Sequence, residues 1–474
     1  MVKKTDMDRR SFIGNLATFS GSLAIACSSL GRRANAFAQT GDISNLKAEG
    51  FGELFPTATK NTGETFLSLP RGFEYNVIGK VRSTMSDGRP TPPAHDGMWT
   101  FKVGRELRIV RNHEVTGGRV PKPGTAIGTS NHYDETVAGG TTTLVIDQKT
   151  RELERDFVSL SGTMINCAGG PTPWGSWISC EETTLGQTVR TNARTGAKTG
   201  GFPKPHGYCF EVPASANNAL PAVPLKAMGR FVHEAVAVDK SGVVYLTEDY
   251  NPSGFYRFLP NRNKRLAEGG TLQVLAIKDK DRYDTRTGQK QGARLPVRWV
   301  TIPNPDPLEA DVDDMAVFKQ GQAAGAASFN RLEGCCIDKK GRPYFTSTSG
   351  GNAKAGQIWM YEPSGKDDGY LHLLFESPSK ELLYMPDNIC HRRKSDLLFV
   401  CEDGDYPGEE SKNHLRILAP NGKMAAFARN ISKDFPRTEF AGSVFSPDGK
   451  TLFVNLQSAG CTFAIWGDWS KFRS

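Results

Sequence analysis

A fourteen-residue step between polar residues recurs along this chain and constrains its fold more than any other feature. The step links Cys167 to Glu181, Glu234 to Glu248, Glu333 to Ser347, Asn388 to Glu402 and Ala441 to Asn455. A turn-forming pair such as Ser241-Gly242 lies near each midpoint, and a short β-prone run such as 244–247 leads to the second member. Residues equidistant from a hairpin turn face each other across the two strands. The sequence therefore predicts one repeated hairpin whose open end carries carboxylates, amides and, once, a thiol.

The repeat predicts an all-β protein, a six-bladed β-propeller with inserted loops and a short helical insertion. Six copies begin at Asp96, Cys167, Glu234, Glu333, Asn388 and Ala441. Such spacings indicate a radial repeat, and closure into a propeller hides most sheet edges. The largest insertion spans 260–330 and contains a basic loop, 278–294, and an expected helix within 306–326. The loop 191–206 is expected to be exposed. A strand within 69–78 is predicted to close the ring against 463–466.

The N-terminal segment predicts export rather than a part of the fold. Asp8-Arg9-Arg10-Ser11-Phe12-Ile13 matches a twin-arginine signal. We therefore divide the chain into a signal peptide (1–38), an extended lead-in (39–64) and a single propeller domain (65–474). The expected location is periplasmic or secreted, with the twin-arginine translocation machinery as a partner.

Composition excludes two classes of partner. Residues 1–36 hold six basic and two acidic residues, so removing them lowers the formal charge of +8 by four, to +4. The remaining charge is dispersed, and no basic run with interleaved aromatics points to nucleic acid. No stretch approaches the ~20 apolar residues of a membrane span, so no stable membrane association is expected. A monomer is the expected state.

The open ends of six converging hairpins would gather many acids around one axis. The polar residues at these ends are Asp96, Glu114, Cys167, Glu181, Glu234, Glu248, Glu333, Asp387, Asn388, Glu402 and Glu439. Close carboxylate pairs repel by several kcal/mol even at an effective dielectric constant of ~20, so either cations bind there or most side chains point elsewhere. Oxygen ligands favour hard ions such as calcium, and a thiolate adds affinity for a transition metal such as iron. Any single Glu at a strand end is more often solvated or paired with a cation, above all Glu248.

Alternation along the strands assigns two further thiols a plain packing role. Cys180 and Cys401 directly precede Glu181 and Glu402, so their side chains should turn away from the acids and into the core. His233, beside Glu234, is interpreted as a partly buried structural histidine.

Several of these segments closely resemble motifs of the PhoX-type alkaline phosphatases, a family of iron- and calcium-dependent β-propeller phosphatases. The resemblance extends from about Leu69 to Trp466. The matching segments are Asn166-Cys167-Ala168-Gly169-Gly170, 177–182, Arg111-Asn112-His113-Glu114, 229–234, Arg331-Leu332-Glu333-Gly334, Pro386-Asp387-Asn388, Glu439-Phe440-Ala441-Gly442 and 445–449.

The resemblance implies a phosphatase that hydrolyses phosphate monoesters at a channel cluster of ferric iron (Fe3+) and calcium (Ca2+). It implies that Cys167 bridges two ferric ions, with Glu234 and Glu333 also on iron. Glu114, Glu181, Asp387 and Glu439 are the implied calcium ligands. Asn112 and Arg331 would hold the phosphate oxygens, and a guanidinium suits that task because it can meet two oxygens at once. The family's phosphate-binding lysine is not placed; Lys278 and Lys280 are candidates.

Two other functions fit the acidic channel. One is a calcium-dependent lactone hydrolase, which has no use for Cys167. The other is a non-catalytic propeller that binds a partner and uses the acids as a structural calcium site. Metal stoichiometry, the natural ester, the acceptance of diesters and any disulfide pairing stay open at this stage.

Overall fold

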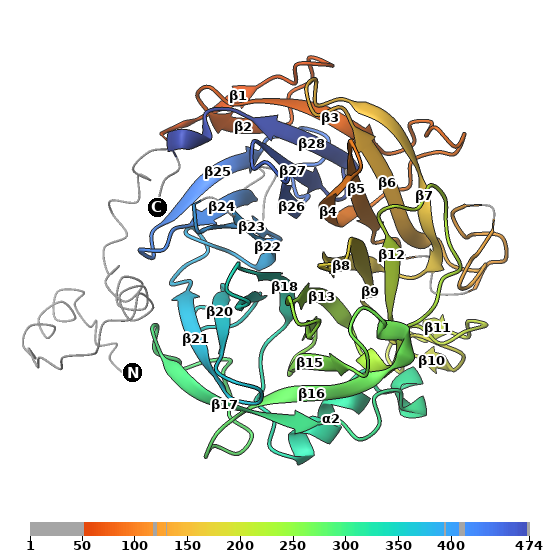
Figure 1. The fold of residues 1–474 in the computed structure, drawn as a ribbon, viewed down its shortest axis with the longest axis vertical. Helices are drawn as coiled ribbons and strands as arrows, with labels where there is room; N and C mark the ends of the chain where they lie inside the picture. The colour runs from red at the N-terminus through yellow and green to blue at the C-terminus, as the bar shows by residue number, and fades with distance from the viewer. Residues whose placement is uncertain (1–51, 117–120, 129, 393–394, 407–412, 472–474) are drawn as a thin grey trace, which may run out of the picture.

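The computed structural model describes residues 52–116, 121–128, 130–392, 395–406 and 413–471, and within them β-strands account for nearly all regular structure. The predicted signal peptide 1–38 and the first part of the lead-in, 39–51, lie outside these residues. The strands form antiparallel meanders arranged around a central axis (Figure 1). The predicted all-β, propeller-like architecture is confirmed.

Two sheets form the first part of the ring. One contains, in order, β4 (His95–Val103), β5 (Glu106–His113), β6 (Gly139–Ile146) and β7 (Leu153–Thr163). The next contains β8 (Asn166–Pro171), β9 (Ser176–Glu181) and β12 (Cys209–Pro213), with the separate hairpin β10 (Val189–Thr191) and β11 (Lys198–Gly200) inserted before β12.

A nine-stranded sheet follows, and it unites what the repeat predicted as two units. Its members in chain order are β13 (His233–Val238), β14 (Val244–Glu248), β15 (Phe255–Pro260), β16 (Gly270–Ile277), β17 (Arg294–Thr301), β18 (Leu332–Ile337), β19 (Pro343–Ser347), β20 (Gln357–Pro363) and β21 (Gly369–Glu376). Strand β17 pairs with β16 on one side and with β21 on the other, so it joins the two meanders at their outer edges. The sheets therefore do not divide into six separate units, and the number of blades stays a prediction.

The last two sheets each combine strands from both ends of the chain. One contains β22 (Pro386–Arg392), β23 (Leu397–Glu402), β24 (His414–Leu418) and β25 (Met424–Asn430), extended by β2 (Leu67–Pro70) and β1 (Leu54–Thr57). The other contains β26 (Phe440–Phe445), β27 (Thr451–Leu456), β28 (Cys461–Trp466) and β3 (Glu74–Lys80). Strand β3 pairs with β28, with Val77 opposite Phe463, so the predicted closure of the ring is confirmed.

Helical segments are few and short among the described residues. The helix α2 (Ala316–Ala323) and the 3-10 turn Leu308–Asp311 form the predicted helical insertion. Further 3-10 turns are Lys226–Met228, Leu266–Glu268 and Trp469–Lys471. No helix within these residues has the length and apolar character needed to span a membrane.

One expectation about loops needs correction. The region 191–206 is not simply an exposed loop, because Phe202 and His206 within it are buried. Its polar composition hides these two buried residues. The described part of the expected lead-in contains β1, which pairs with β2.

The hydrophobic core lies between neighbouring sheets rather than in one place. Strands such as β9, β13 and β23 are buried along their whole length, because each sheet is covered on both faces. Cys180 and Cys401 lie in two of the resulting apolar clusters, as predicted. Each fully buried aliphatic or aromatic side chain contributes about 1.5–3 kcal/mol, so this distributed core holds the ring closed.

Candidate metal centre

The innermost strands β4, β8, β13, β18, β22 and β26 contact one another in a closed ring around the axis. Each of them carries the same irregularity, in which two residues of the inner strand face one residue of its partner strand. The paired positions that flank it are His95 and Met98, Asn166 and Gly169, His233 and Val236, Leu332 and Cys335, Pro386 and Ile389, and Ala441 and Val444. This is a β-bulge, which re-aims a side chain. Five of the six bulges begin with Asp96, Cys167, Glu234, Glu333 or Asp387.

Three carboxylates come together at each of two points, and the bulges supply all three at the first point and Asp96 at the second. Oxygens of Glu234, Glu333 and Asp387 lie within 4.8 Å of one another, and all three residues are buried. Cys167 belongs to the same region, since its Sγ lies 3.3 Å from the carbonyl oxygen of His233 and 3.6 Å from that of Glu234. We call Glu234, Glu333, Asp387 and Cys167 the inner cluster.

A second group, the outer cluster, consists of Asp96, Glu114 and Glu439. Its oxygens also lie within 4.8 Å of one another, and only Asp96 is fully buried. The amide of Gln457 donates to Asp96 Oδ2 at 3.3 Å and to Glu114 Oε2. All seven residues of the two clusters except Asp96 were predicted as ligands from the sequence, and the structure brings those six together.

In three hairpins the second strand ends in two consecutive acids, and the two acids of each pair have different roles. Glu181, Glu248 and Glu402 turn away from the axis and bind the loops behind it. The residues that follow them are Glu182, Asp249 and Asp403, and these interact with the clusters. Burial raises the pKa of Glu182, and the charges of Glu114, Asp249 and Glu333 raise it further. The sequence reasoning missed these three residues, although each stands second in a visible acidic doublet.

The structure therefore does not bring Glu181 to either cluster. Its Oε1 accepts hydrogen bonds from the Met164 amide at 2.9 Å and from His206 Nδ1 at 2.6 Å. Its Oε2 accepts from the amides of Gly207 and Tyr208 at 2.8 and 3.1 Å. The bulge explains the displacement, because it pairs Asn166 rather than Cys167 with Glu181.

Burial and mutual repulsion govern the charge state of both clusters. Burial, followed by the charges of Asp387 and Glu333, raises the pKa of Glu234 well above its usual value. Burial likewise raises the pKa of Glu114 to about 7. Burial also raises the pKa of the Cys167 thiol, and the charge of Glu234 raises it further. Two carboxylates about 4.8 Å apart repel by roughly 3 kcal/mol at an effective dielectric constant of 20. The ionised clusters therefore need positive charge nearby.

Arg331 supplies one such charge. Its Nε and Nη2 donate to the two carboxylate oxygens of Asp249 at 2.9 and 3.0 Å, and Nη2 also donates to Glu333 Oε1 at 2.6 Å. Burial alone would lower its pKa, but Glu333 and Asp249 raise it, so the guanidinium stays charged. About a third of this side chain is exposed.

Asn112 is fully buried, and both its amide nitrogen and its amide oxygen form hydrogen bonds within the protein. Nδ2 donates to the carbonyls of Cys167 at 3.3 Å and Ala168 at 2.6 Å. Oδ1 accepts from Trp177 Nε1 at 2.8 Å and Ser179 Oγ at 2.9 Å. The structure thus places Asn112 where it positions the Cys167 bulge rather than where it would meet a phosphate.

The two lysines considered for phosphate binding both lie away from the clusters. Lys278 pairs with Asp368 at 2.5 Å, and Lys280 packs over the ring of Tyr283.

The donor set fits cations. Asp96 Oδ1 and Glu234 Oε2 are buried and lack hydrogen-bond partners among the described residues, as expected for oxygens that complete a metal site. The outer cluster offers oxygen only, which suits a hard ion such as calcium. The inner cluster adds a thiol, which suits a transition metal.

Comparisons with known proteins give a family match for the sequence and similar folds among solved structures. The profile of the family described as "Alkaline phosphatase PhoX" matches residues 51–157 and 148–460. Among solved structures, Pseudomonas fluorescens PhoX in complex with vanadate, a transition state analogue, is similar over 90% of this chain and 100% of its own, with 18% identity and a TM-score of 0.63. A gluconolactonase from Xanthomonas campestris matches over 88% of this chain and 98% of its own, with 10% identity and a TM-score of 0.40. No curated protein matches the sequence.

Proposed function

The chain belongs to the PhoX family of alkaline phosphatases, and from that premise we propose how its metal centre is built and where the enzyme works. It is a phosphatase, and its substrates are phosphate esters. The observation that carries the proposal is the ring of six inner strands, on or beside which lie two triads of carboxylates and one thiol.

We assign ferric iron to the inner cluster and calcium to the outer one. Cys167, Glu234 and Glu333 would hold iron together with Asp387, and Asp96, Glu114 and Glu439 would hold calcium. The thiol in one cluster and the oxygen-only donors of the other support this division. When bound, such ions supply the positive charge that phosphoryl transfer requires.

The protein's own residues position the substrate beside these clusters. Arg331 would turn its charged face to the phosphate oxygens, while Asp249 and Glu333 fix the plane of the guanidinium. Asn112 would act indirectly, without contacting the substrate, since it holds the backbone of the Cys167 bulge in place. Glu182, Asp249 and Asp403 would balance the charge of the bound ions at the mouth of the channel.

The hydrolysis of p-nitrophenyl phosphate, measured with and without a chelator and followed by iron and calcium analysis, tests this proposal. The Cys167→Ala variant should lose activity and bound iron and remain folded. Cys401→Ala is the matched control, because it removes an equally buried thiol from the hydrophobic core. Full activity and iron content in Cys167→Ala would refute the role of this residue.

We also propose six blades, counting β13–β16 and β18–β21 as two units that share the outer strand β17. The closed ring of six inner strands supports this count. We propose that residues 1–38 direct the enzyme through the twin-arginine route to the periplasm or the medium, and that it works there as a monomer. Replacing Arg9 and Arg10 with Lys should retain the enzyme in the cytoplasm, and light scattering of the exported protein gives its mass.

A further inference from the structure

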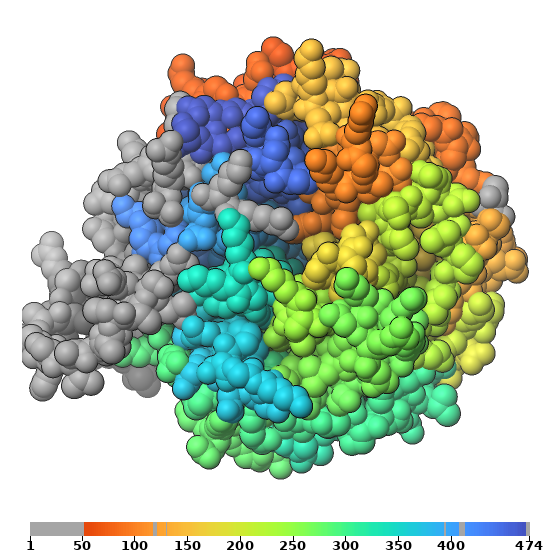
Figure 2. Space-filling model, viewed as in Figure 1, coloured from red at the N-terminus to blue at the C-terminus, as the bar shows by residue number. Residues whose placement is uncertain are grey.

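A cavity of about 540 Å³ occupies the part of the central channel that lies toward the hairpin turns. Residues of all six inner strands line it, and so do the turns that follow β8, β13 and β18. Its volume lies within the range of about 300–1,000 Å³ that is usual for small-molecule sites. Figure 2 shows one face of the molecule, on which segments from many parts of the chain meet near the axis.

This cavity is separate from the metal centre. None of the carboxylates of the two clusters lines it, but the residue after each bulge acid does, as with Gly97, Ala168 and Ala235. Neighbouring inner strands pack closely at the bulges, since a Cβ added at Gly97 would lie only 2.5 Å from Ala168 Cα. Likewise, a Cβ at Gly334 would lie 2.5 Å from the carbonyl oxygen of Asp387. The small residues of the bulges thus line the cavity, and the cluster carboxylates do not.

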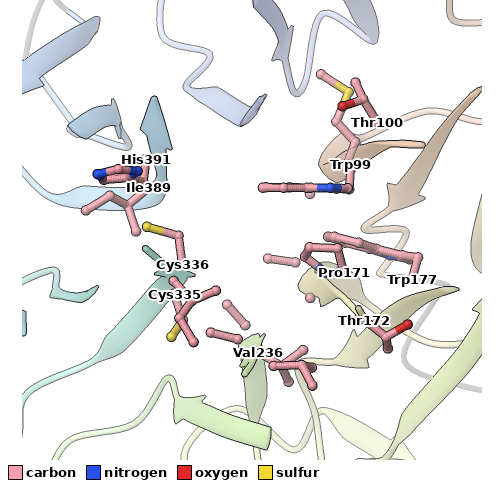
Figure 3. Close-up of a pocket in the computed structure, with 18 of the residues that line it drawn as sticks. Trp99, Thr100, Pro171, Thr172, Trp177, Val236, Cys335, Cys336, Ile389 and His391 are labelled. Atoms are coloured by element: carbon pink, nitrogen blue, oxygen red, sulfur yellow. The ribbon is translucent and has the colours of Figure 1, made fainter. Parts of the chain in front are cut away.

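The walls of the cavity are apolar and partly flat. Figure 3 shows the indoles of Trp99 and Trp177 on one side, and Cys335 and Cys336 on the opposite side. The indole nitrogen of Trp177 already donates to Asn112. The polar atom of this indole is therefore already paired within the protein. His391 also belongs to the lining, and its Nδ1 is buried without a hydrogen-bond partner among the described residues.

The rim of the cavity is positive. Lys102, Lys240 and Lys339 line it from three different hairpins, and all three are exposed. In the part of the chain that the structure describes, no carboxylate lies within 4.0 Å of their ammonium groups. The two acids at the rim are already engaged, because Asp239 accepts from the Ser241 amide at 2.8 Å and Asp338 binds Arg342 Nε at 2.7 Å.

We propose that this end of the channel binds a flat organic anion, namely an aromatic ring system that carries a carboxylate or sulfonate group. The ring would enter between the indoles and the opposite wall, and the acid group would stay at the rim among the lysines. The apolar interior favours the ring through burial, and the unpaired ammonium groups favour the negative charge. This inference does not depend on the reaction at the metal centre.

Titration with 8-anilinonaphthalene-1-sulfonate, a flat aromatic sulfonate whose fluorescence rises on burial, tests the proposal. Saturable binding with one site per chain is expected in the metal-loaded enzyme. Changing Lys102, Lys240 and Lys339 together to Ala should weaken binding about tenfold, the sum of three exposed charge interactions of roughly 0.5 kcal/mol each. Trp99→Ala should weaken it as well, and added salt should act on the lysine contribution alone.

A second triple variant controls for net charge and for the folded state. Lys149, Lys290 and Lys366 are exposed lysines outside the cavity, and changing all three to Ala removes the same charge. This variant should bind the probe as the unmodified enzyme does, and both triple variants should retain phosphatase activity. Equal weakening in the two variants, binding that does not saturate, or displacement of the probe by inorganic phosphate would each overturn the proposal. The last outcome would place the probe at the metal centre.

Discussion

At the scale of the residue, Glu181 and Glu182 offer a matched test of which acid serves the metal centre. The two differ by one position, yet Glu181 binds His206 and two backbone amides, whereas Glu182 interacts with Glu114 and Glu333. Glu182→Gln should lower phosphatase activity or metal affinity about 10- to 100-fold, the usual cost of disturbing a residue that supports a metal site. The measurement is activity against added metal concentration.

Glu181→Gln should act differently, because it disturbs the contact with His206. It should lower the melting temperature while the metal content per folded molecule stays unchanged. If Glu181→Gln lost metal and Glu182→Gln did not, the original assignment of Glu181 as a ligand would stand.

Arg331 allows a prediction about phosphate rather than metal. Arg331→Ala removes charge-assisted hydrogen bonds, which contribute about 1.5–3 kcal/mol each. The inhibition constant for free phosphate should therefore rise at least about tenfold while iron and calcium stay bound. Arg331→Lys keeps the charge but not the planar fork, and should restore only part of the affinity. Unchanged inhibition by phosphate in Arg331→Ala would count against the role of this residue.

His206 links stability to pH. Burial by itself lowers its pKa, but the charge of Glu181 and the hydrogen bond to Asp134 outweigh burial and raise the pKa to about 9. An unfolded histidine titrates near 6.5. The extra stability, on the order of 3 kcal/mol, is thus fully present below about pH 6.5 and is lost as the pH rises through about 9.

The His206→Gln variant measures this contribution. Its melting temperature should lie furthest below that of the parent near pH 6 and should approach the parent value by about pH 10. A difference that is constant with pH, or that grows toward pH 10, would show that His206 is not charged in the folded protein.

These residues also show what the sequence could and could not predict about the site. Cys167, Glu234 and Glu333 were found because each stands at a fixed distance from a hairpin turn. Glu114, Asp387 and Glu439 stand outside the fourteen-residue step, and the resemblance to the family's motifs assigned them as ligands. Glu181 was predicted to face the metal centre, but Glu182 does so instead. The side of the sheet to which a residue points depends on the strand register. One inserted residue changes the register, and the printed sequence does not mark where the insertion falls.

At the scale of the element, the bulge is the device that builds the centre. A regular inner strand would send successive side chains alternately toward the two sides of the sheet. In five of the six inner strands the bulge begins with an acid or thiol, and in four of these a glycine or alanine follows it, such as Gly97 or Gly334. The small residues were visible in the sequence, but their role depends on the neighbouring strand, which no local pattern contains.

Gly97→Ala tests the bulge directly. The new Cβ would lie 2.5 Å from Ala168 Cα and 3.0 Å from the Cys167 carbonyl oxygen, so strand β8 must move. Such overpacking should lower the free energy of unfolding by about 1–3 kcal/mol. Activity should fall further, by up to about 100-fold, because a misplaced thiol disturbs the site geometry. Urea unfolding and steady-state kinetics measure the two effects.

The control is Gly175→Ala in the hairpin turn that follows β8. Gly175 has φ +90 and open space around it, so this change adds backbone strain of about 1–3 kcal/mol without any contact near the acids. Its activity per folded molecule should match that of the parent. If both variants lost activity to the same extent, general destabilisation rather than the bulge would explain the loss.

At the scale of the whole molecule, the ring was predictable because its repeats are spaced along the chain. Closure was predictable too, since β3 and β28 are both strongly β-prone runs near the two ends of the domain. The merging of two meanders through β17 was not, because that strand lies in an insertion without repeat character. Long-range pairing at an outer edge depends on which edge is free after folding, and the sequence pattern of one strand does not encode this.

The buried acids of the two clusters also determine how the stability of the metal-free protein depends on pH. In the metal-free protein, burial raises the pKa of Glu114 to about 7, and it raises the pKa values of Glu234 and Glu333 as well. These carboxyls ionise in the unfolded chain near pH 4.3. Above that pH the unfolded state releases its protons first, so folding is penalised increasingly until the folded carboxyls also ionise. Glu114 alone contributes on the order of 3 kcal/mol to this penalty.

Metal-stripped protein should therefore melt at a markedly lower temperature at pH 8 than at pH 5.5, and the loss should exceed that of the metal-loaded enzyme over the same range. The comparison with the loaded enzyme cancels the contribution of His206, which falls with pH in both forms. Bound cations favour the ionised carboxylates, so the stabilisation by added calcium and iron should grow as the pH rises. Calorimetry of both forms across this range measures the difference. A metal-free protein whose melting temperature is unchanged or higher at pH 8 would mean that the acids do not face one another across the channel.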